Sequence, residues 1–137
     1  MGRMTSLDRK REHLATIAAI VRRMSLGALL LEGWSLLLVT ALLVVSHNPE
    51  WARFAWLALF LAIAFWTFDA HLVRQKLLFS SLHERVQALP EADIDCTLDT
   101  SLVDREAYAW RSIFLRPRLV LFHGAILLAI GVVRGLA

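Results

Sequence analysis

Residues 25–46 read SLGALLLEGWSLLLVTALLVVS, a run of 22 residues in which Glu32 is the only charged side chain. At 1.5 Å per residue, a helix of this length measures about 33 Å, which matches the roughly 30 Å hydrocarbon core of a bilayer. Two further stretches, residues 54–68 and 119–133, contain no charged residue. The three stretches together predict three transmembrane helices.

The composition argues against an ordinary soluble domain. Of the 137 residues, 58% are hydrophobic and 20% are charged, and the mean hydropathy is +0.57. An average soluble domain is nearer half apolar and a quarter charged. A chain of 15.5 kDa cannot bury three such apolar stretches in one small core. We therefore expect an all-α membrane protein in contact with the lipid bilayer.

The uneven distribution of basic residues predicts an orientation in the membrane. Residues 1–24 and 71–118 together contain 13 Lys and Arg residues, and Arg53 and Arg134 are the remaining two. The positive-inside rule places the N-terminus and the large loop in the cytoplasm, with a short C-terminal tail outside. We expect the bacterial inner membrane. Residues 71–118 contain seven basic and seven acidic groups, so no basic face for a nucleic acid is predicted.

Local patterns divide the chain into four segments. The N-terminal segment has apolar residues at helical spacing among basic ones, so it is predicted to lie on the bilayer or to lead into it. The dipeptide Asn48-Pro49 predicts a tight turn between the first two spans. The predicted segments are a basic amphipathic cytoplasmic helix (1–24), a transmembrane hairpin (25–70), a cytoplasmic helical domain with an acidic loop (71–117), and a third transmembrane helix with a short tail (118–137).

Two helices are predicted within the cytoplasmic domain. The second span is expected to continue as a helix into water until Pro90 ends it. A second helix is predicted from about Ser101, because Ser101 and Asp104 have the spacing of a capping box. Its expected buried residues are Leu102, Tyr108, Ile113 and Phe114.

The third apolar stretch, residues 119–133, is short. Its 15 residues would measure about 22 Å as a helix, which is less than the usual span. Arg118 and Arg134 flank the stretch, and their long side chains can reach outwards to the headgroups. A spanning helix is therefore predicted, and a re-entrant or in-plane segment is the alternative.

Glu32 is the residue most informative about function. It lies about seven residues inside the first span, where an unpaired carboxylate costs several kcal/mol or takes up a proton. The expected partner is His123, at similar depth in the third span, and Asp69 ends the second span on the same side. These three residues are candidates for an ion path or for the polar lining of an oligomeric pore. Alternatively, they form interhelical hydrogen bonds that fix helix packing.

Two further sets of residues suggest contacts with other helices and with lipid. Small residues let helices approach closely, and basic residues at the ends of spans contact lipid headgroups. The expected packing residues, within a subunit or between subunits, are Gly27, Gly33, Ala58, Ala62, Ala125 and Ala129. The expected headgroup residues are Arg22, Arg23, Arg116 and Arg118.

We find no sequence pattern typical of catalysis, of a cofactor or of a metal site. The chain lacks GxSxG, HExxH, P-loop and GxGxxG motifs, so no enzyme activity is expected. The acidic loop 93–104 has oxygen-bearing side chains at alternate positions, as in a calcium-binding loop. However, Leu98 stands where such a loop needs glycine. A solvated acidic connector is therefore the prediction for this loop.

The stretch Asp69-Ala70-His71-Leu72-Val73-Arg74-Gln75-Lys76-Leu77-Leu78-Phe79 resembles a junction in the RipA-type (RipA-family octameric) small bacterial membrane proteins. That family has Asp-Ala, two aromatic residues, an aliphatic residue, Arg-Gln, two polar residues and Leu-Phe at this point. Leu89-Pro90 and the segment from Asp95 to Thr100 are also similar to the residues after this junction in the family. The resemblance covers about 35 residues and implies a cyclic homo-oligomer of eight subunits in the inner membrane, without enzyme activity.

These observations lead to two hypotheses about function. The first is a homo-oligomeric channel or pore-like assembly, such as a membrane effector, with Glu32, Asp69 and His123 near its polar interior. The second is a non-catalytic scaffold or accessory subunit whose cytoplasmic helices recruit a soluble protein partner.

Overall fold

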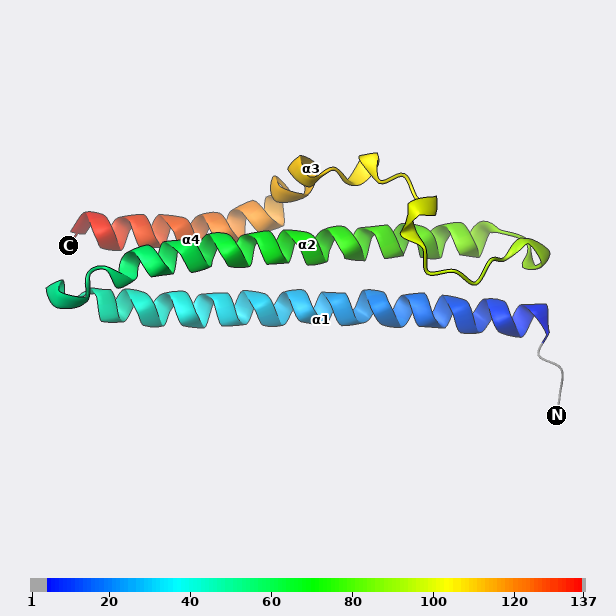
Figure 1. The fold of residues 1–137 in the computed structure, drawn as a ribbon, viewed down its shortest axis with the longest axis horizontal. Coiled ribbons are helices and arrows are strands. Elements are labelled where there is room, and N and C mark those ends of the chain that lie inside the picture. Colours follow the sequence, from blue (N-terminus) through cyan, green and yellow to red (C-terminus); the bar gives the residue numbers. More distant parts are fainter. Residues whose placement is uncertain (1–4, 137) are drawn as a thin grey trace.

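The computed structural model describes residues 5–136, which form an all-helical chain (Figure 1). Its α-helices are α1 (Ser6–Ser46), α2 (Phe54–Ala88), α3 (Trp110–Phe114) and α4 (Pro117–Leu136). Within the described residues, three helical stretches are long and apolar enough to cross a membrane: Ser6–Ser46, Phe54–Ala88 and Glu106–Gly135, the last of which contains most of α4. This confirms the prediction of three such helices. Residues 1–4 and 137, parts of the predicted N-terminal helix and tail, lie outside the described residues.

α1 and α2 form a long antiparallel hairpin, and local signals define its ends. The Thr5 hydroxyl accepts a hydrogen bond from the backbone N–H of Asp8, and the Asp8 carboxylate accepts one from the backbone N–H of Thr5. This capping box begins α1. The predicted turn is confirmed, because the Asn48 side chain caps a short 3-10 helix, Pro49–Trp51, between the two helices. α2 ends two residues before Pro90, as its sequence predicts.

α1 is continuous from the amphipathic N-terminal segment through the first apolar stretch. The structure therefore has the arrangement in which the amphipathic segment leads into the span. The 41 residues of α1 correspond to about 60 Å, whereas the 20 residues of α4 correspond to about 30 Å. The hairpin consequently extends well beyond α4 at the end where α1 begins (Figure 1). We call this extension, residues 6–24 of α1 and 71–88 of α2, the stalk.

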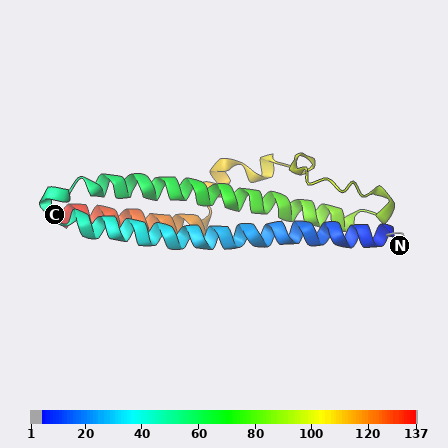
Figure 2. The same cartoon turned by 60° about the horizontal axis from the view of Figure 1, so that its bottom comes forward.

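α4 lies along the other half of the hairpin and runs towards the α1–α2 connection (Figure 2). It is longer than the 15-residue stretch that suggested it, because Pro117 begins the helix and the residues after Val133 continue it. A continuous helix of 20 residues reaches across a hydrocarbon core of about 30 Å. This length favours a spanning helix over a re-entrant one.

Three apolar clusters hold these parts together. One joins all three long helices and contains Val39, Ala58, Ala62, Ile126 and Ile130. A second lies in the stalk and contains Ile17, Leu78, Leu82, Val86 and Val103. A third, at the start of α4, contains Ala70, Ile113 and Leu119. Because Val103 and Ile113 belong to these clusters, the connection between α2 and α4 packs along the hairpin, and a separate domain is not seen.

The prediction of a second helix from Ser101 is wrong. Between α2 and α3 the chain forms three short 3-10 helices, at Glu91–Asp93, Thr100–Leu102 and Glu106–Tyr108. The physical reason is that Asp99 and Asp104 accept hydrogen bonds from backbone N–H groups two and three residues ahead. Such side chains favour turns over a continuing helix. Of the residues expected to be buried, Ile113 is buried, Tyr108 and Phe114 are half-buried, and Leu102 is exposed.

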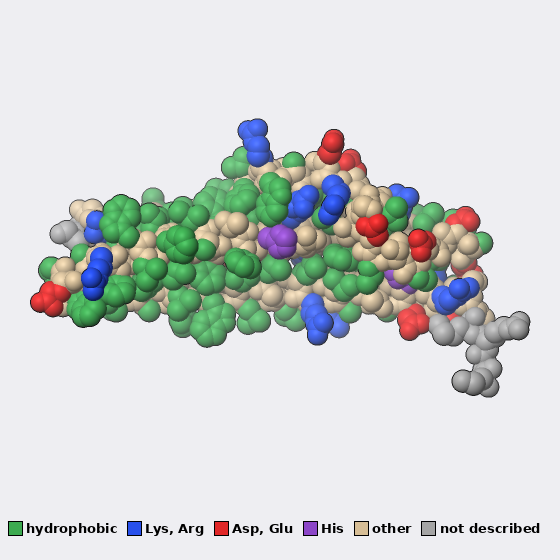
Figure 3. All heavy atoms as spheres, viewed as in Figure 1, with side chains coloured by type: hydrophobic (Ala, Val, Ile, Leu, Met, Phe, Trp, Pro, Cys, Tyr) green, Lys and Arg blue, Asp and Glu red, His purple; other side chains and the backbone are tan. Residues whose placement is uncertain are grey.

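The surface reflects the same division along the length of the molecule. Hydrophobic side chains cover much of the half that contains α4, whereas acidic and basic side chains are concentrated over the stalk and at the molecule's ends (Figure 3). Large exposed side chains in the apolar half include Leu30, Phe60, Phe68, Leu121 and Leu128. An apolar surface of this kind is suited to contact with lipid.

Candidate intramembrane polar site

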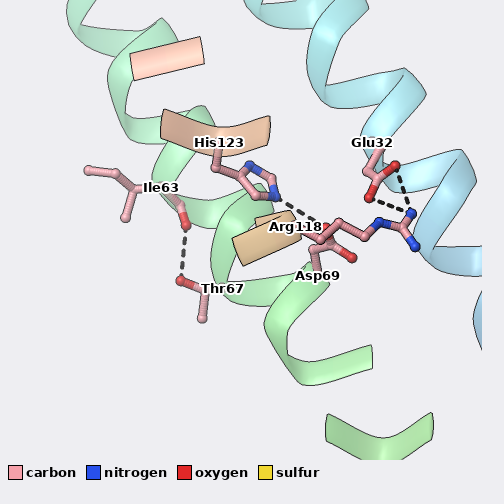
Figure 4. A network of polar contacts seen from close by, with 6 residues as sticks. All are labelled: Glu32, Ile63, Thr67, Asp69, Arg118 and His123. Carbon is pink, nitrogen blue, oxygen red and sulfur yellow. Dashed lines mark hydrogen bonds and ion pairs between the residues drawn. The ribbon is translucent and has the colours of Figure 1, made fainter. Parts of the chain in front are cut away.

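The three polar residues singled out from the sequence lie on three different helices near the start of α4 (Figure 4). Glu32 belongs to α1, Asp69 to α2 and His123 to α4. They form two separate pairs, Asp69 with His123 and Glu32 with Arg118. The site is therefore a set of two polar contacts that connect α4 to each helix of the hairpin.

Asp69 and His123 form a buried contact between α2 and α4. Asp69 Oδ2 lies 3.2 Å from His123 Nε2, and each side chain is only 1% exposed. The geometry requires a proton between these two atoms, donated either by the imidazole or by a protonated carboxyl group. The pair thus provides α4 with a directional contact in an otherwise apolar interface.

Aromatic rings surround the imidazole. The ring of Trp66 stacks on His123 with a centroid distance of 5.8 Å and an interplanar angle of 10°. The neighbouring Phe122 meets the imidazole edge-on at 5.0 Å. Trp66 also contacts Phe114, which precedes α4. These rings hold the imidazole in place and exclude solvent from it.

Several buried polar atoms of the apolar half have no hydrogen-bond partner among the described residues. They are Asp69 Oδ1, His123 Nδ1, Trp66 Nε1 and Ser35 Oγ. A buried polar atom without a hydrogen bond is unfavourable by about 1–3 kcal/mol. The Asp69–His123 contact therefore directs the packing of the two helices at a cost in desolvation.

The prediction that Glu32 pairs with His123 is wrong. Both Glu32 carboxylate oxygens accept hydrogen bonds from Nη2 of Arg118, at 2.9 and 3.2 Å. The physical reason is that His123 faces α2, whereas Arg118, in the first turn of α4, lies beside α1 (Figure 4). The Glu32 side chain is 14% exposed and that of Arg118 is 68% exposed. This second pair consequently lies at the edge of the site.

The small residues behave differently from one another within the subunit. Ala58 and Ala62 are buried between helices, as expected of packing residues. A Cβ placed on Gly27 would lie 3.6 Å from Leu72 of α2, so Gly27 also lies at an interface. A Cβ on Gly33 would meet nothing within 4 Å. Gly33 therefore makes no close helix contact in the subunit, and Ala125 and Ala129 are exposed.

Sequence reasoning missed Ser35, Trp66 and the pairing role of Arg118. Ser35 is fully buried and lies one helical turn after Glu32, a spacing that places both on one face of α1. Trp66 lies three residues before Asp69 on α2, a spacing that also indicates a shared face. The sequence predicts that Arg118 contacts lipid headgroups, as do Arg22, Arg23 and Arg116, and all four side chains are exposed.

Among the described residues, no group of three or more His, Cys, Asp or Glu side chains is arranged to hold a metal ion. Thr67, near Asp69, donates its hydroxyl hydrogen bond to Ile63 of its own helix, so it adds no link between helices (Figure 4). What the arrangement does physically is to fix α4 against the hairpin.

The fold and the site together define a class of protein: an all-helical membrane protein with three helices able to span the bilayer. No protein-family model, curated protein or solved structure matches the chain. The resemblance to the RipA-type proteins therefore stays a prediction.

Proposed function

We propose that the protein is a non-catalytic membrane scaffold that assembles as a homo-oligomer and presents its stalk to a soluble protein partner. The observation that supports this proposal is the length of the hairpin. α1 has 41 residues and α4 has 20, so the hairpin projects about 30 Å beyond the end of α4. A rigid projection of this size is suited to holding a binding surface away from the bilayer.

The chemistry of the stalk supports the same function. Its apolar residues Ile17, Leu78 and Leu82 pack inside it, whereas charged side chains such as Arg22 and Glu84 are exposed. A cleft of about 500 Å³ lies between its two helices, with Arg22, His83 and Glu84 among the lining residues. The positive-inside count favours a cytoplasmic stalk in the bacterial inner membrane.

A pore-like assembly receives less support from the geometry. A pore between subunits needs polar groups on the outer face of each subunit, but Asp69 and His123 are 1% exposed and pair with each other. Glu32 is also paired within the subunit. Glu32, Asp69 and His123 therefore contribute to packing inside a subunit, which is the role that interhelical hydrogen bonds have in membranes.

Ion flux into liposomes separates the two functions. We expect the purified wild-type protein to give no flux above that of empty liposomes, and Glu32→Gln to behave in the same way. A conductance that disappears in Glu32→Gln, with the oligomeric mass unchanged, would reject the scaffold and support the pore.

Site-specific photo-cross-linking in cells tests for the partner. A cross-linking residue at exposed Glu84 of the stalk is expected to capture one soluble protein reproducibly. The matched control places the same residue at Leu121, which is 73% exposed in the apolar half. Capture of the same protein from both positions, or from neither, would contradict a partner site on the stalk.

A further inference from the structure

An elongated groove runs between α1 and α4 on the outside of the apolar half. It encloses about 550 Å³ and is lined on one side by Leu36 and Leu43 of α1. On the other side it is lined by Ala125 and Ala129 of α4, with Arg118 also in its wall. The alanine side chains are too short to fill the space between the two helices, so the small-residue pair that predicted a helix contact instead leaves this groove open.

The dimensions of the groove match part of a lipid. From Arg118 to Ala129 the groove follows α4 for 11 residues, which correspond to about 16 Å. One leaflet of a hydrocarbon core is about 15 Å thick. The volume also falls within the range of ligand sites, about 300–1,000 Å³. A single acyl chain would therefore fit lengthwise, with its polar end beside Arg118.

The Arg118 end of the groove carries unused positive charge. Among the hydrogen bonds of the described residues, Arg118 uses only Nη2, which pairs with Glu32. The N–H groups on Nε and Nη1 remain for another acceptor, and the side chain is 68% exposed. Arg116, two residues earlier, is also exposed. The two arginines and Glu32 together have a net charge of +1.

We propose that this groove binds one anionic phospholipid, whose acyl chain lies between α1 and α4 and whose phosphate pairs with Arg118 at the stalk side of the bilayer. A second copy of the chain fits less well. The acidic residues of the apolar stretches 25–46, 54–70 and 119–133 are Glu32 and Asp69, and both already pair inside their own subunit. A phosphate supplies the missing anion, and guanidinium binds phosphate particularly well.

Native mass spectrometry of the detergent-solubilised protein tests this site. The probes are phosphatidylglycerol and phosphatidylcholine with identical acyl chains. We expect the wild-type protein to retain phosphatidylglycerol about fivefold to tenfold more than phosphatidylcholine, because one basic group near a membrane surface favours an anionic lipid by about this factor. Equal retention of the two lipids would overturn the proposal.

Two variants probe the two ends of the site. Ala125→Phe fills the groove without touching Arg118, and we expect it to reduce phosphatidylglycerol retention at least fivefold. The matched control is Leu128→Phe, because Leu128 is on the same helix, is 71% exposed and does not line the groove. Equal effects of the two substitutions would contradict an acyl chain in the groove. A change in oligomeric mass with Ala125→Phe, at unchanged lipid retention, would assign the groove to a second copy.

The charge end is tested with the double variant Glu32→Gln plus Arg118→Gln, which leaves neither charge unpaired and so preserves folding. We expect its phosphatidylglycerol and phosphatidylcholine retention to become equal. A remaining preference for phosphatidylglycerol would overturn the role of Arg118. Excess soluble glycerol phosphate is expected to leave the bound lipid in place, and displacement by it would show a headgroup site without an acyl-chain groove.

Discussion

Removing the Asp69–His123 contact gives the sharpest test of the site. The two substitutions are Asp69→Leu, which keeps branching at Cγ, and His123→Phe, which keeps an aromatic ring against Trp66. Each single variant leaves the other polar group buried with no partner, because Asp69 Oδ1 and His123 Nδ1 already have none. The loss for one stranded group is about 1 kcal/mol. The double variant strands neither group.

We therefore expect each single variant to lose about 1 kcal/mol of the free energy of unfolding, and the double variant to lose almost none, whereas independent losses would sum to about 2 kcal/mol. The coupling of about 2 kcal/mol lies near the upper end of interhelical hydrogen bonds in membrane proteins, as full burial of the pair predicts. The assay is reversible unfolding in mixed micelles, with increasing amounts of a denaturing detergent.

The control cycle pairs His123→Phe with Thr67→Val. The Thr67 hydroxyl donates its hydrogen bond to the backbone carbonyl of Ile63 in its own helix. The losses in free energy of unfolding from these two substitutions should therefore add. If the losses for Asp69→Leu and His123→Phe also add within about 0.5 kcal/mol, the two side chains do not interact and the description of the site is wrong.

Three further predictions concern other parts of the structure. Glu32→Gln should lower the free energy of unfolding by no more than about 1 kcal/mol, because its arginine partner is mostly exposed; mixed-micelle unfolding measures this. In the same assay Ala62→Leu should lower the free energy of unfolding by about 1–3 kcal/mol, because it overpacks a buried interface. Gly33→Leu should change the free energy of unfolding little, because a Cβ at Gly33 meets nothing within 4 Å. Hydrogen bonds from the Thr5 side chain and backbone lower the pKa of Asp8 below 3.8, so the cap contributes fully above that pH and is lost as pH falls through the lowered pKa. In the wild type, hydrogen exchange in the first turn of α1 should accelerate as the pH falls through the lowered pKa of Asp8. Thr5→Ala should make this exchange rate depend less on pH.

Much of the fold is readable from the sequence because its causes are local. Hydropathy and length identify three helices able to span a bilayer, and Asn48 and Pro49 mark the turn between two of them. Pro90 marks the end of α2 because proline cannot continue the hydrogen-bond pattern of a helix. Each of these signals depends on neighbours in the chain, which the sequence shows directly.

The segment between α2 and α3 shows where local signals compete. Ser101 and Asp104 have the spacing of a capping box, but Asp99 caps the turn at Ser101, and Asp104 caps the following turn instead. Both outcomes are compatible with the same residues. The turns that form bring Val103 and Ile113 into apolar clusters on the hairpin, tertiary contacts that periodicity does not reveal.

The prediction of His123 as the partner of Glu32 is wrong for a geometric reason. Sequence position gives the depth of a residue in a span, and Glu32, Asp69 and His123 do lie in one region near the start of α4 (Figure 4). It does not give the rotation of each helix about its axis, which decides which side chains face each other. His123 therefore faces α2 and pairs with Asp69, whereas Arg118 faces Glu32.

These pairings bear on how α4 is held. In lipid, helix association depends on van der Waals packing and interhelical hydrogen bonds, because the lipid is as apolar as the helix surface. The apolar cluster holds α4 against the hairpin without a preferred direction, so the polar contacts of α4 determine its rotation and register. Asp69–His123 fixes its rotation against α2, and Glu32–Arg118 fixes its first turn against α1. At the other end Arg134 lies over the ring of Trp56 at 5.4 Å, which makes a cation–π contact with α2. Because α4 has polar contacts at both ends, it cannot slide or rotate freely, and the groove beside Ala125 keeps a defined shape.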